Sequence, residues 1–160
     1  KEGIADKNRI CMYGASYGGY STLMGVAKEP DLYRCAFGNV GVYDLAAWYR
    51  IGDAKDSKSG ITYLREAVGT RDLDSASPAK LAARIKVPVY LTAGREDVRT
   101  PAKQTEMMHE ALLKAGKQVD MHIYEGEGHG NFLLKNRIDF YQRLLGFLDK
   151  HIGPGSQKSK

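Results

Sequence analysis

The sequence predicts an α/β fold, with a mostly parallel sheet flanked by helices. Four short runs of strand-like residues alternate with segments long enough to form helices. Strands that alternate with helices build βα units, which place helices on both faces of a parallel sheet. A single domain is expected, because 160 residues with 42% apolar content can bury one core.

The third and fourth expected strands show two different patterns. The third, at 87–93, is mostly apolar, as a strand buried on both faces requires. The fourth alternates, with Val119, Met121 and Ile123 on one face. The four strands are expected at residues 10–13, 35–40, 87–93 and 119–124.

Two long helices are expected in the second half of the chain. The first has Thr100 as N-cap and Pro101 at its first position, and Gly116 ends it. The second spans about residues 133–150. The least regular region, 44–77, is expected to be helical in pieces. On their inward faces the first helix is expected to place Gln104, Met107, Met108, Ala111, Leu112 and Ala115, and the second Ile138, Tyr141, Leu145 and Leu148.

Charge and hydropathy exclude two classes of partner. The net charge is +5, but the basic residues are scattered among acids and form no stripe with interleaved aromatics, so no nucleic acid is expected. No apolar run approaches the roughly 18 residues of a membrane span, so no membrane is expected. The polar segment 153–160 is expected to be a disordered tail, which leaves 1–152 as the folded part.

The two cysteines and the start of the chain carry less information. Cys11 and Cys35 lie in apolar strand-like segments, so we expect buried free thiols. They leave the compartment open between a cytoplasmic and a periplasmic or secreted parent. The chain begins without Met and with only a short polar lead, which suggests that it was cut from something longer.

A candidate nucleophile, Ser16, lies between the first expected strand and the helix after it. Residues 14–18 read GASYG, which fits G-x-S-x-G in the strand-to-helix setting that exposes the serine hydroxyl above the sheet. Glycines at 14, 18 and 19 remove side chains that would collide in so sharp a turn. The alternative is a phosphate-binding loop, which would require a lysine or a G-x-G-x-x-G spacing that is absent here.

A serine hydroxyl needs a base, and His129 is the expected one. It lies in a glycine-rich loop between the last strand and the last helix, from which an imidazole can reach over the sheet edge. A loop histidine without a chemical role is the alternative. His109, His122 and His151 lie in a helix, on the polar side of a strand and near the chain end, so they are interpreted as structural or solvated.

The third group must be a carboxylate at the end of another strand, because it has to orient the histidine and stabilise the imidazolium. Glu96 and Asp97 both follow the third strand, and we prefer Asp97. The order Ser16, Asp97, His129 along the chain is that of α/β-hydrolases.

Three motifs together resemble the prolyl oligopeptidase family of serine peptidases. Residues 14–20 resemble its G-x-S-Y-G-G-Y elbow, 97–101 with Gln104 its D-x-R-V-P-x-x-Q segment, and 126–130 its histidine loop. The resemblance spans residues 6 to about 148 and supports Asp97 over Glu96. Two departures are Thr100 in place of the usual valine and Ala93 where many relatives have histidine.

The resemblance implies an enzyme that hydrolyses the peptide bonds of peptide substrates through an acyl-enzyme on Ser16, with no cofactor and no metal. It implies that the Tyr17 amide is an oxyanion-hole donor and that Arg99 binds a substrate backbone carbonyl. Val42 and Trp48 would line the pocket for the residue before the cleaved bond. From their chemistry alone, Trp48 is equally a core anchor and Arg99 a surface charge.

The resemblance also implies parts outside this chain. Family members such as dipeptidyl and acylaminoacyl peptidases carry a β-propeller and the first half of the hydrolase sheet ahead of this segment. The chain is therefore expected to be the C-terminal half of an α/β-hydrolase fold, without the second oxyanion donor that the earlier half normally supplies. Its first strand would leave an open edge, through which a dimer is the alternative. Two rival functions remain: a carboxylesterase with the same triad, and a non-catalytic binding module.

Overall fold

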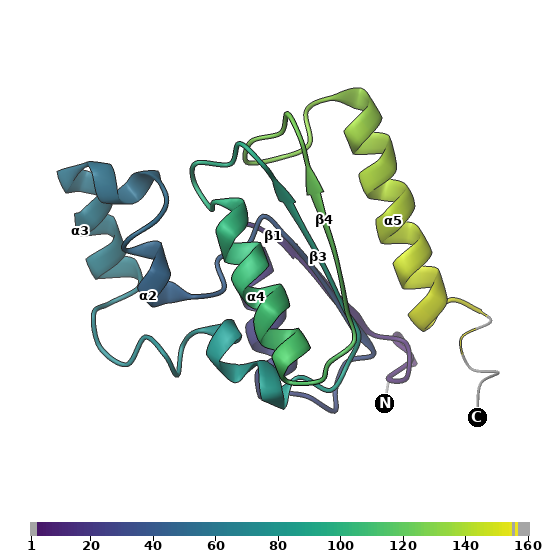
Figure 1. Ribbon diagram of the computed structural model, residues 1–160. Coiled ribbons are helices and arrows are strands. Elements are labelled where there is room, and N and C mark those ends of the chain that lie inside the picture. The colour runs from purple at the N-terminus through teal and green to yellow at the C-terminus, as the bar shows by residue number, and fades with distance from the viewer. Residues whose placement is uncertain (1–2, 155, 157–160) are drawn as a thin grey trace.

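A four-stranded parallel sheet organises the computed structural model, which describes residues 3–154 and 156 (Figure 1). The strand order is β1-β2-β3-β4, and every neighbouring pair is parallel. Helical segments follow the strands and cover both faces, so the predicted α/β fold is confirmed. The strands are β1 (Cys11–Ala15), β2 (Cys35–Asn39), β3 (Val89–Gly94) and β4 (Val119–Tyr124).

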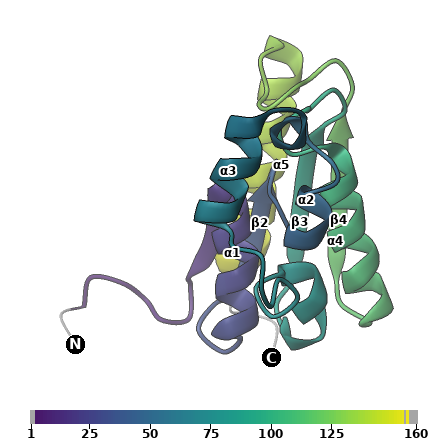
Figure 2. The ribbon, with the colours of Figure 1, turned by 90° about the vertical axis from the view of Figure 1, so that its left-hand side faces the viewer.

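One face of the sheet is covered by α1 (Tyr17–Lys28), η2 (Pro78–Arg84) and α4 (Ala102–Lys114). Because side chains alternate along a strand, Val89 and Leu91 of β3 both face this layer. Figure 2 shows α1 and α4 on the viewer's side of the sheet, with α5 behind it. The fully buried residues of this core include Leu23, Val26, Ala36, Ile85, Met108 and Leu112.

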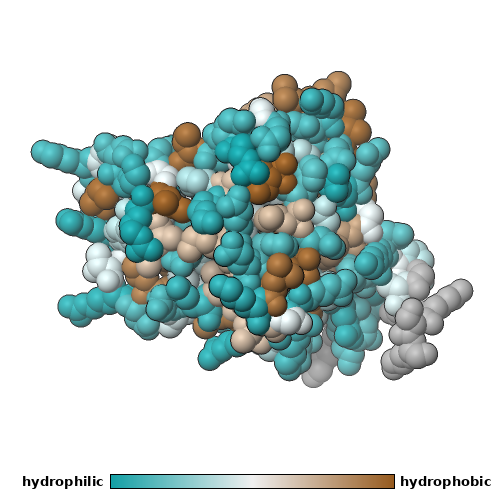
Figure 3. Space-filling model, in the orientation of Figure 1, coloured by the Kyte–Doolittle hydropathy of each residue, from teal (hydrophilic) through white to brown (hydrophobic). Residues whose placement is uncertain are grey.

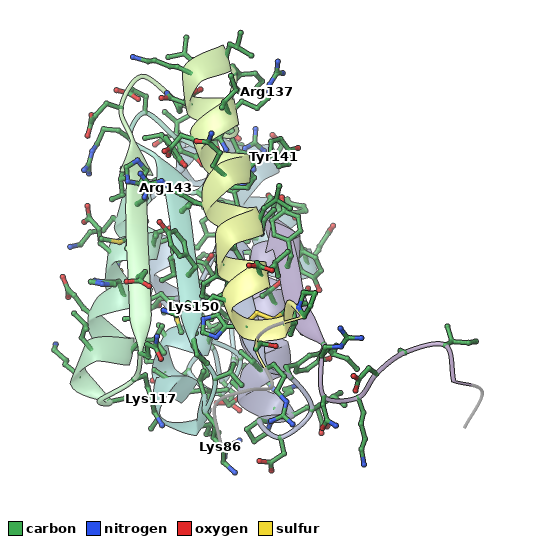
Figure 4. The ribbon with its side chains drawn as sticks, turned by 90° about the vertical axis from the view of Figure 1, so that its right-hand side faces the viewer. Lys86, Lys117, Arg137, Tyr141, Arg143 and Lys150 are labelled. Carbon is green, nitrogen blue, oxygen red and sulfur yellow. A yellow bond between two sulfur atoms is a disulfide. The ribbon has the colours of Figure 1, made fainter. Side chains whose placement is uncertain are left out.

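Within the described residues, the other face is covered by a single helix, α5 (Leu134–Ile152), as Figure 4 shows. Its inward residues are Phe140, Leu144 and Phe147, which pack on Phe37 of β2. The predicted inward face was therefore wrong except at its margin, where Leu148 is partly buried against this core. The exposed fractions of the other three are 50% for Ile138, 53% for Tyr141 and 63% for Leu145.

The physical reason is that α5 carries two apolar stripes of helical period. The stripe of Phe140 and Phe147 meets a cluster of rings on the sheet, in which Phe37 stacks on Tyr90 with ring centroids 4.9 Å apart. Large aromatic side chains bury more apolar area than aliphatic ones, so the stripe with the two phenylalanines packs against the sheet and the other stripe faces outward. Figure 4 shows Arg143 on the β4 side of α5 and Tyr141 on the opposite side.

The start of α4 also differs from prediction. The helix begins at Ala102 with Pro101 at the N-cap, and no side chain caps it. The Thr100 hydroxyl instead turns away to neighbours near the end of the sheet. The predicted stop is confirmed, because Gly116 follows the helix with φ of 68°, a conformation that glycine adopts at little cost.

The region between β2 and η2 forms a helical excursion of α2 (Leu45–Trp48), η1 (Asp53–Asp56) and α3 (Lys58–Ala67). The predicted helical pieces are confirmed. In Figure 1 these elements lie to the left of the sheet. They enclose a small core of their own, with Val42, Leu45, Trp48, Ala54 and Leu64.

The two cysteines are joined in a disulfide, so the prediction of free thiols was wrong. Cys11 and Cys35 are directly opposed in the register of β1 and β2, with Cα atoms 4.6 Å apart. That separation is within the range a disulfide can bridge. Strand pairing, which composition cannot reveal, brought the two thiols together.

The described part of the chain includes no helix that is both long and apolar enough to cross a membrane. Of the predicted disordered tail 153–160, residues 155 and 157–160 lie outside the described part. Figure 3 shows apolar side chains at the top of the molecule, where the loop before α5 and its first turn lie in Figure 1. Phe132, Leu133 and Leu134 are the exposed apolar residues of that segment.

Candidate active site

Ser16 occupies the strained turn between β1 and α1. Its φ of 57° and ψ of −121° are rare for a residue with a side chain, and its N–H donates to the carbonyl of Asn39 at 2.9 Å. A Cβ on Gly14 would lie 2.2 Å from the Gly18 carbonyl oxygen. A Cβ on Gly19 would lie 2.9 Å from Cα of Gly41 in the loop after β2. Gly14 and Gly19 therefore allow close backbone contacts, as the sequence predicted. The prediction was wrong for Gly18, because a Cβ there would meet nothing within 4 Å.

Ser16, His129 and Asp97 converge above the carboxyl ends of the strands. Oγ of Ser16 lies 2.8 Å from Nε2 of His129, and Nδ1 of the same ring lies 2.8 Å from Oδ2 of Asp97. Ser16 follows β1, Asp97 follows β3 and His129 follows β4, so the parallel sheet brings their loops to one edge. The three side chains chosen from the sequence are brought together.

The positions of the protons follow from the partners. An ionised carboxylate can only accept, so Nδ1 of His129 carries a proton and donates it to Asp97. In the neutral ring Nε2 then has no proton and can accept the hydrogen bond of the Ser16 hydroxyl. This tautomer is the one a general base needs, because Nε2 can take up the serine proton.

Asp97 is buried and tightly bound by donors. Its side chain has no exposed area, and its Oδ1 accepts the N–H groups of Arg99 and Thr100 at 2.9 Å each. Burying a carboxylate is costly unless such hydrogen bonds compensate. Glu96 is exposed, and only its backbone bonds the histidine loop, through Glu127.

The loop that carries His129 is held by a buried carboxylate, Glu127. One of its oxygens accepts the N–H of Phe132, and the other those of Leu133 and the Asn136 side chain. Burial alone would raise the pKa of Glu127, but these three hydrogen bonds and the nearby Lys135 outweigh it and lower the pKa. The loop is thereby tied to the start of α5.

Close backbone packing holds the same loop from below. A Cβ on Gly94, the last residue of β3, would lie 2.2 Å from the Gly128 carbonyl oxygen. Only glycine allows this approach. The end of β3 therefore fixes the position of the histidine loop relative to the sheet.

Tyr17 is the first residue of α1, so its N–H has no acceptor within the helix. Such N–H groups at a helix start favour negative charge. The Tyr17 side chain is 73% exposed and lines the cavity beside Ser16. The predicted oxyanion donor is therefore a helix-start amide next to the serine, with no acceptor in the part of the chain that the structure describes.

A cavity of about 850 Å³ opens beside Ser16 and His129. Val42 and Trp48, predicted for a substrate pocket, are buried residues of its wall. Other wall residues come from the helical excursion and the loop after β3, among them Ala54, Tyr63, Val68 and Val98.

Arg99 also lines this cavity, with a side chain 59% exposed. Its Nε pairs with Oδ2 of Asp53 at 3.1 Å, and its carbonyl accepts from Nε1 of Trp48 at 3.2 Å. A Cβ on Gly52 would lie 2.9 Å from the same carbonyl. The excursion and the loop after β3 therefore form one wall.

Three residues of the site were missed or misread from the sequence. Asp53 lies in the least regular region, where no motif points to it. Glu127 is inside the histidine loop, and its isolation between glycines was the available signal. Thr100 was interpreted as a helix cap, although the structure places it against Asp97.

The remaining histidines lie elsewhere, as predicted. His109 is part of α4. His122 of β4 lies near Asp139 and Arg143, and burial together with Arg143 lowers its pKa. His151 is in the last turn of α5, where burial lowers its pKa. None of the three lines the cavity beside Ser16.

A serine in a strained strand-to-helix turn, above a parallel sheet covered by helices on both faces, defines an α/β-hydrolase domain. The model of the prolyl oligopeptidase family matches residues 1–155. The chain belongs to the prolyl oligopeptidase family.

Similar proteins are peptidases several times longer. Dipeptidyl peptidase family member 6 of Caenorhabditis elegans is 28% identical over 163 residues, covering 98% of this chain and 22% of that protein. Dipeptidyl aminopeptidase BIII of Pseudoxanthomonas mexicana is 27% identical, with 96% of this chain and 23% of that protein covered. This chain therefore spans about a quarter of the length of such relatives.

Solved structures agree with this picture. A puromycin-hydrolyzing peptidase of Mycobacterium tuberculosis superposes with a TM-score of 0.84 at 27% identity, over 94% of this chain and 23% of that one. An acylaminoacyl peptidase in complex with a Z-Gly-Gly-Phe-chloromethyl ketone gives a TM-score of 0.83 at 25% identity, over 95% and 25%. The fold is therefore that of a hydrolase catalytic domain.

Proposed function

We propose that this chain carries the catalytic centre of a serine peptidase, with Ser16 as nucleophile, His129 as base and Asp97 as the acid that orients it. The observation that carries the proposal is the unbroken chain of hydrogen bonds from Ser16 Oγ through both ring nitrogens of His129 to Asp97. Membership of a peptidase family supports a peptide substrate.

In the acylation half, Ser16 Oγ attacks the carbonyl carbon of the scissile amide while Nε2 of His129 takes up its proton. The imidazolium that forms is stabilised by the buried carboxylate of Asp97. The same proton passes to the leaving nitrogen, the C–N bond breaks, and an acyl-enzyme ester remains on Ser16.

In the deacylation half, water attacks the ester carbonyl and gives a proton to Nε2 of His129. The Ser16 oxygen leaves and takes that proton back, which releases the acid product. In both halves negative charge develops on the carbonyl oxygen. The Tyr17 N–H is proposed as one of its donors, because it is unpaired at the helix start beside Ser16.

The cavity beside Ser16 is proposed as the substrate pocket. Val42 and Trp48 contribute apolar surface to the cavity wall. Such a surface suits the side chain of the substrate residue before the cleaved bond. Arg99 is proposed to bind a backbone carbonyl of the substrate, since its pairing with Asp53 uses Nε and leaves other guanidinium donors for a ligand.

Covalent labelling tests this function. A fluorophosphonate probe should modify the natural full-length protein at Ser16, as peptide mass mapping would show. The Ser16→Ala protein should remain unmodified, and Ser21→Ala, which removes a half-buried serine of α1, should be labelled like the wild type. Labelling elsewhere, or none, would contradict Ser16 as nucleophile.

A substrate panel then separates peptidase from esterase. Peptide amides and matched esters that share one acyl group are compared by kcat/KM. A peptidase should cleave the amides with turnover. Ester cleavage with no detectable amide cleavage would favour a carboxylesterase with the same triad.

A further inference from the structure

Thr100 occupies an unusual position behind the catalytic pair. The residue is 2% exposed, and its Oγ1 lies 2.8 Å from the carbonyl oxygen of Val40 and 3.0 Å from Oδ2 of Asp97. Nδ1 of His129 is 3.2 Å away. The hydroxyl thus touches the same carboxylate oxygen that holds the imidazole.

A hydroxyl has one proton to donate and two lone pairs to accept with. Both Val40 O and Asp97 Oδ2 are acceptors, so the single proton of Thr100 is shared between them. The lone pairs of Oγ1 are then left for the Nδ1 proton of His129. Each arrangement favours the tautomer in which Nδ1, and not Nε2, carries the proton.

Thr100 also joins three separate loops. Val40 follows β2 in a left-handed conformation, with φ of 43°, which is strained for a β-branched residue. Its N–H donates to Thr92 of β3 at 2.8 Å, and its carbonyl accepts from Thr100. The hydroxyl therefore connects the loop after β2 to Asp97 after β3 and His129 after β4.

We propose that Thr100 is a positioning residue of the catalytic centre, whose hydroxyl holds Asp97 and the His129 ring in register with Ser16. The inference rests on the proposed peptidase function. It assigns Thr100 no contact with substrate. It acts through Asp97 and His129, so its loss should affect turnover more than binding.

The charged groups near His129 have partners of their own. Asp97 faces Nδ1, and on the cavity side Arg99 and Asp53 are paired with each other. Glu127 is engaged by Phe132, Leu133 and Asn136. Removing the Thr100 hydroxyl would therefore change the hydrogen bonds of Asp97 and of Nδ1 directly and leave the other charges near the ring as they are.

The test is Thr100→Val in the natural full-length protein, which keeps the side-chain shape and replaces the hydroxyl with a methyl group. We expect kcat to fall about tenfold while KM stays within about twofold. Thr100→Ser, which keeps a hydroxyl at this position, should restore kcat.

Thr105→Val is the matched control. Thr105 is a fully buried threonine of α4 whose hydroxyl has no hydrogen-bond partner among the described residues. The same substitution there should leave kcat as in the wild type. It reports what loss of a buried hydroxyl does without the contact to Asp97.

Two results would overturn the assignment of Thr100. One is a Thr100→Val protein with wild-type kcat, and the other is a Thr100→Ser protein as impaired as Thr100→Val. Failure of the peptidase proposal looks different, because then Ser16 of the wild type would not react with a fluorophosphonate, or the wild type would show no amide turnover. Labelling of Ser16 in all variants therefore separates the two failures.

Discussion

At the scale of single residues, backbone strain and chemistry coincide. Among the described residues, those other than glycine with positive φ are Ser16, Val40 and Asp72, and two of these adjoin the proposed catalytic centre. Strained conformations cost free energy and persist where the surroundings enforce them. Here the glycines around Ser16 and the hydrogen bonds of Val40 enforce the strained conformations.

Loss of either end of the Ser16–His129 pair should abolish turnover. Ser16→Ala and His129→Ala are each expected to remove nearly all kcat in the full-length protein, because the residues of a catalytic triad, as proposed here, act as a unit. For the same reason the double variant should be little worse than either single one. Steady-state kinetics on the three proteins check this.

His109→Ala is the control, since this histidine of α4 lies outside the cavity. It should retain wild-type kcat. If the two catalytic losses add instead of coinciding, one of the residues has a role separate from the other.

At the scale of elements, the loop before α5 depends on one buried carboxylate. Glu127 satisfies the N–H groups of Phe132 and Leu133 just where α5 starts without a capping side chain. Orphan N–H groups at a helix start are normally satisfied by such acceptors. The position of His129 and the start of α5 are thereby coupled.

Glu127→Gln should destabilise the protein, because an amide NH₂ would face one of the three N–H donors. We expect the free energy of unfolding at pH 7 to fall by about 2 kcal/mol. The pKa of Glu127 is lowered in the folded state, so its stabilisation is present above the ordinary carboxyl pKa and is lost as pH falls through the lowered value. The difference between the proteins should therefore shrink below about pH 4.

Urea unfolding at several pH values measures this difference. Glu125→Gln is the control in the same loop, because Glu125 is exposed and only ion-paired with Arg95. It should change stability by no more than about 0.5 kcal/mol. A Glu127→Gln effect that is constant with pH would contradict the assigned role of the carboxylate.

Short-range signals predicted the elements and most of the site. The strand-to-helix turn at Ser16, the carboxylate at Asp97 and the loop at His129 are each local patterns, and the parallel order of strands then brings them together. The predictions that failed depended on which of several residues distant in sequence a side chain contacts. The buried face of α5 was decided by the rings on β2 and β3, and the fate of the Thr100 hydroxyl by Asp97.

At the scale of the whole molecule, the sheet has two edges, β1 and β4. The outer edge of β1 has no partner strand among the described residues. Tyr13 on this strand is 49% exposed and lies near Tyr141 of α5, which is also exposed. Open edges of this kind pair readily with further strands.

Residues 1–160 expressed alone should be catalytically near-dead. The Tyr17 amide is the one oxyanion donor proposed in this chain, and absence of a second donor typically costs about 100- to 1000-fold in kcat. Amide turnover by residues 1–160 is compared with that of the full-length protein, and the mass in solution is measured by light scattering. Turnover within about tenfold of the full-length protein would refute the need for a donor from elsewhere.

A dimer is the expected alternative state of the isolated chain, formed through the β1 edge. A monomer at all concentrations would remove that alternative. The activity measurement stands independently of this outcome.

The disulfide between Cys11 and Cys35 joins residues 24 apart in the sequence and so closes a covalent ring of backbone. The ring contains β1, Ser16 and all of α1. A protease that cuts the backbone anywhere inside it opens the ring without releasing a fragment. The nicked protein should therefore run at full length on a non-reducing gel and as two pieces after reduction. A Cys35→Ala protein should separate into two pieces in both gels, with the nucleophile on one and His129 on the other whenever the cut lies after Ser16.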